Sequence, residues 1–112
     1  MNHKEVRMVI CTFPSMEKAR QIGTVLVQMQ LVACVNLIPG IQSIYCWEGK
    51  VESQEEVIAF FKTSAARYQQ LEEKVIEMHP YEVPELVVVD LAAGFPAYLQ
   101  WVLSSTQSTE EK

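Results

Sequence analysis

Residues 41–63 read IQSIYCWEGKVESQEEVIAFFKT and contain two extended segments that meet at a tight turn. The turn is placed at Glu48-Gly49, because glycine supplies the positive φ that a hairpin turn needs. The first segment ends at Trp47 and the second covers Lys50–Thr63. We expect a β-hairpin whose second strand begins with exposed polar residues (52–56) and ends in an apolar stretch that belongs to the core.

A strand and a helix are predicted before this hairpin. Val6–Thr12 is a short apolar run that Pro14 stops, and Ser15 is a favourable N-cap for a helix over Met16–Gln30. One helical stripe is predicted to be buried, and it consists of Ala19, Ile22, Leu26 and Met29. Leu31–Asn36 then begins the next strand, in which Pro39-Gly40 predicts a bulge rather than a stop.

A second helix, a strand and a short helix are predicted after the hairpin. Ser64 opens the helix, which buries Tyr68, Leu71, Val75 and Met78 and ends at His79-Pro80. Glu85–Leu91 is a valine-rich strand. The short helix starts near Pro96 and is expected to place Phe95, Tyr98, Leu99 and Val102 on one side. Residues 1–103 then form one domain, and Ser104–Lys112 is a polar C-terminal tail.

The order of elements is therefore β-α-β-β-α-β followed by a short helix. Right-handed crossovers pack both long helices onto one face of a four-stranded sheet, which is the α+β, ferredoxin-like sandwich. The opposite sheet face has no helical cover within one chain. Because strands this apolar should not remain wet, we expect that face to contact other copies of the chain.

Composition excludes several classes of partner. The 112 residues include 9 Lys+Arg against 14 Asp+Glu, a net charge of −5 at pH 7. Such an acidic chain lacks the phosphate-neutralising surface of a nucleic-acid-binding protein and is repelled by anionic lipid. No apolar run approaches the ~20 residues of a membrane span. We therefore expect no nucleic-acid or membrane partner.

Cysteine usage indicates a reducing compartment. The chain has an odd number of cysteines, and their neighbours are apolar: Cys11, Cys34 and Cys46. The polar N-terminus does not resemble a signal peptide. We expect reduced thiols and a cytoplasmic location. No nucleophile elbow and no glycine-rich phosphate loop occurs in the sequence, so we expect no enzyme.

The candidate metal ligands are soft donors without a standard spacing motif. Cys11 ends a strand, Cys34 lies in another and His79 closes a helix, where an imidazole can bind a metal or act as a base. The alternatives are structural: a free cysteine often packs as a small hydrophobe, and a histidine at a helix C-terminus can serve as a cap. Trp47 is expected to anchor an interface between subunits.

Three motifs together resemble the CutA family of divalent-cation tolerance proteins. They are ACVNLIPG at residues 33–40, YCWEGK at residues 45–50 and HPYEVPE at residues 79–85, in the order that the family has them. The resemblance extends from about Val6 to Leu103. It implies a ferredoxin-like fold and a tight homotrimer with interlocking hairpins, similar to the PII nitrogen-signalling proteins.

The resemblance also implies copper binding by a strand-one cysteine and a histidine pair at the end of the second helix. Cys11 matches the cysteine and His79 the second histidine, whereas Met78 replaces the first. A thioether suits Cu(I) better than Cu(II), so a site of Cys11, His79 and Met78 would prefer the reduced ion. Cys34 is a lesser candidate, and zinc or another divalent cation is the alternative to copper.

Two functions follow as hypotheses. The first is a non-enzymatic, trimeric, copper-binding protein that acts in the response to and tolerance of metal ions. The alternative is a PII-like signalling or scaffold module that binds a small ligand or a partner protein. Its cleft or interface would be lined by Asn36, Trp47, Glu48, Lys50, Tyr81 and Glu85.

Overall fold

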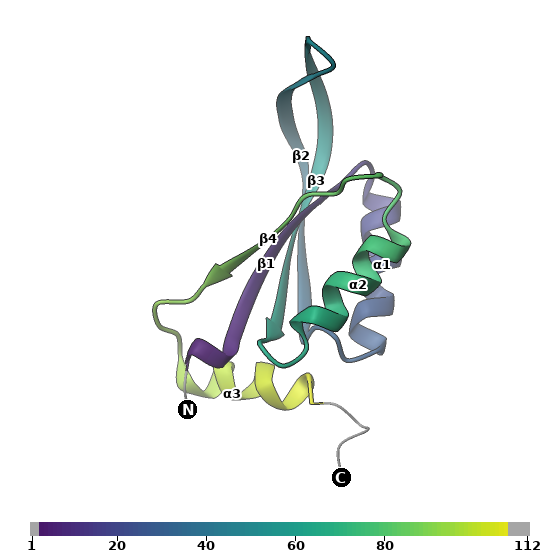
Figure 1. The fold of residues 1–112 in the computed structure, drawn as a ribbon. Coiled ribbons are helices and arrows are strands. Elements are labelled where there is room, and N and C mark those ends of the chain that lie inside the picture. The colour runs from purple at the N-terminus through teal and green to yellow at the C-terminus, as the bar shows by residue number, and fades with distance from the viewer. Residues whose placement is uncertain (1–2, 108–112) are drawn as a thin grey trace.

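The computed structural model describes residues 3–107 and contains one four-stranded antiparallel sheet with strand order β2-β3-β1-β4. Helices α1 and α2 lie on one face of this sheet, as Figure 1 shows. The predicted ferredoxin-like order is therefore confirmed. The elements are η1 (His3–Glu5), β1 (Val6–Phe13), α1 (Met16–Gln28), β2 (Cys34–Trp47), β3 (Lys50–Ser64), α2 (Tyr68–Met78), β4 (Leu86–Asp90) and α3 (Pro96–Ser105).

Strand β1 lies inside the sheet and carries the centre of the core. It pairs with β3 on one side and with β4 on the other. Its alternate residues Val9, Cys11 and Phe13 are fully buried and pack in one cluster with the inner sides of α1 and α2. The buried alternate residues of β1 and the buried residues of α1 and α2 thus form a single apolar layer between the sheet and the helices.

Helix α1 begins as predicted and ends earlier. The Oγ atom of Ser15 accepts a hydrogen bond from the Lys18 N–H at 3.1 Å, which satisfies one of the free donors of the first turn. Ala19, Ile22 and Leu26 are buried, which confirms most of the predicted stripe. Met29 is the exception, because it follows the last helical residue and its side chain is 45% exposed.

Loss of this cap should be measurable as a loss of stability. We expect Ser15→Ala to lower the free energy of unfolding by about 1 kcal/mol, because the Lys18 N–H loses its partner at the helix start. Urea unfolding of both proteins at one protein concentration checks the value. An unchanged urea midpoint would show that water replaces the cap without cost.

Strand β2 contains the predicted bulge, and the bulge changes which residues face which side. The register shifts between Ile38 and Ile41, and Gly40 adopts a positive φ of 78° there. Before the shift, even-numbered residues of β2 pair with even-numbered residues of β3. After the shift, odd-numbered residues of β2 pair with even-numbered residues of β3. Proline is tolerated at this point because β2 is an edge strand.

The hairpin turn is the predicted one. Trp47 pairs with Lys50, and the two turn residues Glu48 and Gly49 have φ values of 51° and 81°. Positive φ at both positions is typical of a type I′ turn, whose twist matches that of the strands. The β2–β3 hairpin extends well beyond the helices (Figure 1).

One expectation about β3 was wrong in part, and one about α2 was wrong. Residues 52, 53 and 55 in the polar start of β3 are exposed as expected, but Glu56 is only 7% exposed because the segment after α2 packs over it. Ser64 was expected to open the second helix, but it is a buried end of β3 and α2 begins at Tyr68. The buried face and the end of α2 at His79 are as predicted.

Helix α3 packs at the end of the sheet where β1 begins, in a small cluster with Val6 and Ala33. Leu99 and Val102 are buried there as expected, whereas Phe95 precedes the helix and is 73% exposed. α3 continues to Ser105 and Thr106 is buried, so ordered structure passes the boundary expected at residue 103. Residues 108–112 of the expected tail lie outside the described residues.

Helix α3 leaves much of the sheet face opposite α1 and α2 without cover. Ile38 and Val87 lie on strands β2 and β4, and each is about half exposed. These two strands therefore present hydrophobic surface on the face away from α1 and α2. None of the helices within residues 3–107 is long and apolar enough to span a membrane.

Candidate functional site

The structure brings Cys11 and His79 to the same backbone oxygen. The Cys11 thiol donates to the Thr12 carbonyl oxygen at 3.7 Å, and His79 Nε2 lies 2.7 Å from the same oxygen. Because a carbonyl can only accept, the proton of the imidazole is on Nε2. The Tyr81 N–H donates to Nδ1 at 3.1 Å, so both ring nitrogens of His79 are engaged.

His79 holds this place because α2 ends at Pro80. The His79 backbone is extended, with φ −71° and ψ 138°, while its N–H still donates to the Val75 carbonyl. Its ring stacks on Phe13 with centroids 4.7 Å apart and an interplanar angle of 18°. Burial lowers the pKa of His79, and the hydrogen bond to Thr12 opposes this only in part, so the ring is neutral at pH 7.

The Cys11 thiol is protonated at neutral pH. Its side chain is fully buried, and this burial, with the nearby Glu85 carboxylate, raises the pKa of Cys11 to about 12. Thiolates rather than thiols bind metals, so a metal ion would have to displace this proton. It would also have to break the hydrogen bonds of His79.

Of the other predicted soft donors, Met78 directly precedes His79 and packs, partly buried, against the core cluster that contains Cys11. Cys34 pairs with Lys62 whereas Cys11 pairs with Ala59, so the two cysteines lie on opposite sheet faces. Residues 3–107 contain no group of three His, Cys, Asp or Glu side chains placed to hold a metal ion. Within the described residues, the cysteine and histidine side chains of a single chain therefore do not assemble a three-ligand site by themselves.

A larger concave region lies between the β2–β3 hairpin and the segment that links α2 to β4. We call this cavity of about 800 Å³ the hairpin cleft. Aromatic and acidic side chains dominate its lining, namely Tyr45, Trp47, Tyr81, Glu52, Glu56, Glu82 and Glu85. None of the lining residues is a lysine or an arginine, so the cleft attracts cations.

A directed chain of hydrogen bonds crosses the hairpin cleft. The Tyr45 hydroxyl donates to Gln54 Oε1 at 3.0 Å, and Gln54 Nε2 donates to the Tyr81 hydroxyl oxygen at 3.3 Å. Tyr81 then donates to Glu56 Oε2 at 2.5 Å. Burial raises the pKa of Tyr81, and its hydrogen bond to Glu56 raises it further. The phenol therefore stays protonated and compensates the buried carboxylate.

The residues proposed from the sequence for a ligand cleft lie only partly in this cavity. Trp47, Tyr81 and Glu85 line it, whereas Glu48 and Lys50 belong to the adjoining hairpin turn and are not among its lining residues. Asn36 also lies away from the lining and accepts a hydrogen bond from Lys62.

Sequence reasoning missed Tyr45, Gln54 and Glu56 as cleft residues. The available signal was the bulge, which places Tyr45 opposite Glu52, on the strand face that also carries Gln54 and Glu56.

Comparison with known proteins gives one consistent result. The model of the family described as CutA1 divalent ion tolerance protein matches residues 7–105. The divalent-cation tolerance protein CutA of Thermus thermophilus is 42% identical over 99 residues, which cover 88% of this chain and 96% of that protein. Mouse protein CutA is 42% identical over 103 residues, but these cover only 58% of its length. The crystal structure of CutA1 from Oryza sativa superposes with a TM-score of 0.90 at 33% identity and covers 96% of this chain and 100% of that one.

Proposed function

The chain belongs to the CutA1 divalent ion tolerance family, and from this premise we propose that it serves divalent-cation tolerance as a binding protein rather than as an enzyme. We propose that copper, or another divalent cation such as zinc, binds at the hairpin cleft. The observation that carries this proposal is an accessible cleft lined by four carboxylates and no basic side chain. Carboxylate oxygens are suitable ligands for divalent cations, and imidazole or thiolate donors can join them for copper and zinc.

We propose that three copies of the chain form the functional unit. The half-exposed Ile38 and Val87 support this, as does Trp47, which is 58% exposed on the projecting hairpin. Burial of apolar surface between copies would stabilise the assembly. Since one chain does not preassemble three metal ligands within residues 3–107, a neighbouring chain would complete the coordination.

Native mass spectrometry of anaerobically purified protein tests the metal site. With Cu(I), Cu(II) or Zn(II) added separately at low excess, we expect trimers that hold one discrete ion per chain. Glu52→Gln with Glu85→Gln should abolish this uptake, because it removes two cleft carboxylates. The matched control is Glu55→Gln with Glu73→Gln, which removes two exposed carboxylates outside the cleft and should leave uptake unchanged.

Cys11 and His79 provide the second comparison in this experiment. Uptake of Cu(I) that survives the cleft variant and disappears in Cys11→Ser, with the trimer retained, would move the site to Cys11 and His79 beside Thr12. A graded, non-stoichiometric series in every protein would contradict the metal-binding proposal.

A second candidate function is a PII-like module in which the hairpin cleft binds a small ligand or a partner protein. The aromatic lining from Tyr45, Trp47 and Tyr81 favours this alternative, because aromatic side chains dominate the energetics of many binding sites. A metabolite that raises the melting temperature of the native protein, where metal ions do not, would support it.

A further inference from the structure

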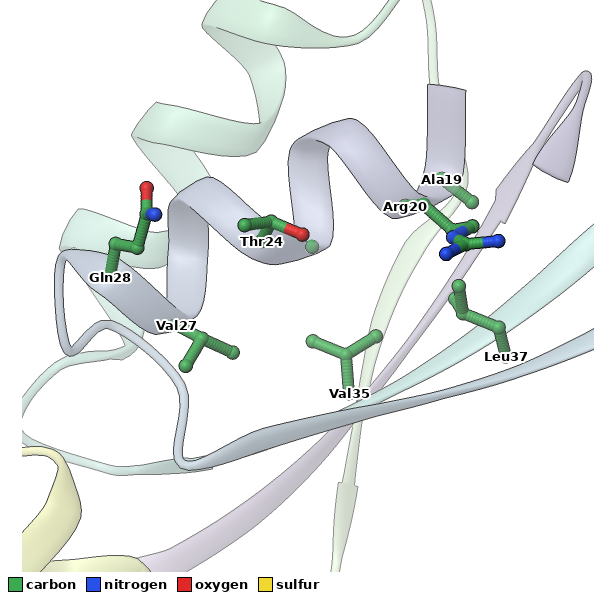
Figure 2. A pocket seen from close by; sticks show the side chains of 8 residues that line it. Ala19, Arg20, Thr24, Val27, Gln28, Val35 and Leu37 are labelled. Carbon is green, nitrogen blue, oxygen red and sulfur yellow. The ribbon is translucent and has the colours of Figure 1, made fainter. Parts of the chain in front are cut away.

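A second concave site lies on the opposite side of the fold, between α1 and the edge strand β2. This groove has a volume of about 320 Å³ and is open to solvent (Figure 2). Its size is at the lower end of the range for small-molecule sites, so it suits a small ligand rather than a folded partner. It shares no lining residue with the hairpin cleft.

The groove has an apolar middle. Ala19, Gly23 and Val27 lie four residues apart on α1 and form one wall, while Val35 and Leu37 of β2 form the other. Figure 2 shows Val27, Val35 and Leu37 arranged along the space between the helix and the strand. The next row of α1 supplies a polar rim of Arg20, Thr24 and Gln28.

Gly23 keeps this space open at a cost to the helix. Glycine in a helix interior is less stable than alanine, and Gly23 has no positive φ that would require it. A Cβ at this position would meet Val35 at 3.5–3.6 Å, an ordinary contact, so packing does not forbid alanine. The missing side chain therefore enlarges the groove without being demanded by the fold.

Arg20 gives the groove its charge. Its guanidinium lies beside Leu37 at one end of the groove in Figure 2. Among residues 3–107 it makes no hydrogen bond or ion pair, although Glu17 lies one turn earlier on the helix. An unpaired guanidinium next to apolar walls is complementary to a carboxylate that carries an aliphatic body.

We propose that this groove binds a small amphipathic monocarboxylate. The carboxylate would pair with Arg20 through two parallel N–H···O bonds, and the aliphatic body would lie against Val27, Val35 and Leu37. The net charge of the chain is −5, so recognition depends on the short-range contact with Arg20 rather than on long-range attraction. This inference does not rest on the proposed metal function.

Octanoate is the probe, and octanamide is its uncharged isostere. In calorimetric titrations of the full chain, octanamide should bind roughly tenfold more weakly than octanoate, or weaker still, because it lacks the charge-assisted bond. Arg20→Gln should weaken octanoate binding by a similar factor. Lys18→Gln removes the same charge from the same helix outside the groove and should change the affinity by less than about twofold.

Gly23→Ala keeps the test independent of misfolding. It should raise the melting temperature, because alanine favours the helix, while it weakens octanoate binding by narrowing the groove. Amide shifts of residues 19–28 and 35–37 should report the bound octanoate. Absence of binding, equal affinity in Arg20→Gln and Lys18→Gln, or shifts that cluster elsewhere would each overturn the proposal.

Discussion

Phe13→Ala is expected to lower the free energy of unfolding by about 3–5 kcal/mol, the largest effect of any single substitution considered for this chain. Phe13 is fully buried at the end of β1. Its ring packs edge-on against Phe61, with centroids 6.4 Å apart, and stacks on His79. Alanine would leave a cavity between the sheet and the end of α2, and the surrounding strands can collapse into it only in part.

Phe95→Ala is the matched control for this prediction. It removes the same side chain from a position that is 73% exposed, so we expect a change within about 0.5 kcal/mol. Urea unfolding followed by far-ultraviolet circular dichroism, at one protein concentration, measures both variants. If Phe13→Ala cost no more than Phe95→Ala, the core assigned to β1 would be incorrect.

His79→Ala is expected to cost about 3 kcal/mol at pH 8. The substitution removes a buried ring and the hydrogen bonds to the Thr12 carbonyl and from the Tyr81 N–H. It also frees the segment that brings Tyr81 to Glu56, so the hairpin cleft should lose its order together with the stability. A small cost would show that the imidazole is not the anchor of this segment.

The pH dependence identifies the same residue in another way. Because the pKa of folded His79 lies below its ordinary value of 6.5, the unfolded chain binds more protons than the folded chain as the pH falls below about 6.5. Stability should therefore decline from pH 7 towards pH 5 in the natural protein, and this slope should be weaker in His79→Ala. His3→Ala is the control, since the chain has only these two histidines. An equal slope in all three proteins would contradict the assignment.

Local patterns predicted the fold because the apolar periodicity agreed with the residues that mark helix ends and turns. Ser15 caps α1, Pro80 follows the end of α2, and Glu48-Gly49 forms the turn, as each residue type favours on its own. Burial of Glu56 could not be predicted in this way. It depends on Tyr81, which is 25 residues away in the sequence and reaches the carboxylate only after the chain has folded.

The candidate site was predictable in its residue types more than in its geometry. The sequence indicated Cys11 and His79, and the structure places both at the Thr12 carbonyl. It could not indicate that both ring nitrogens are engaged or that burial keeps the thiol protonated, since these depend on tertiary contacts. The groove at α1 was missed because Gly23 and Val35 lie close only across the helix–strand interface.

The bulge at Pro39-Gly40 has a consequence for how this protein can diverge. On the helix side of the bulge, β2 contributes Val35 and Leu37 to the core, and substitutions there are constrained by packing. Beyond it, the shifted register lets the outer hairpin carry Ser43 and Tyr45 on the cleft side without altering the inner half. One strand thus contains two segments with separate packing demands, an inner half held by the core and an outer hairpin that extends beyond it, and one inserted residue divides them.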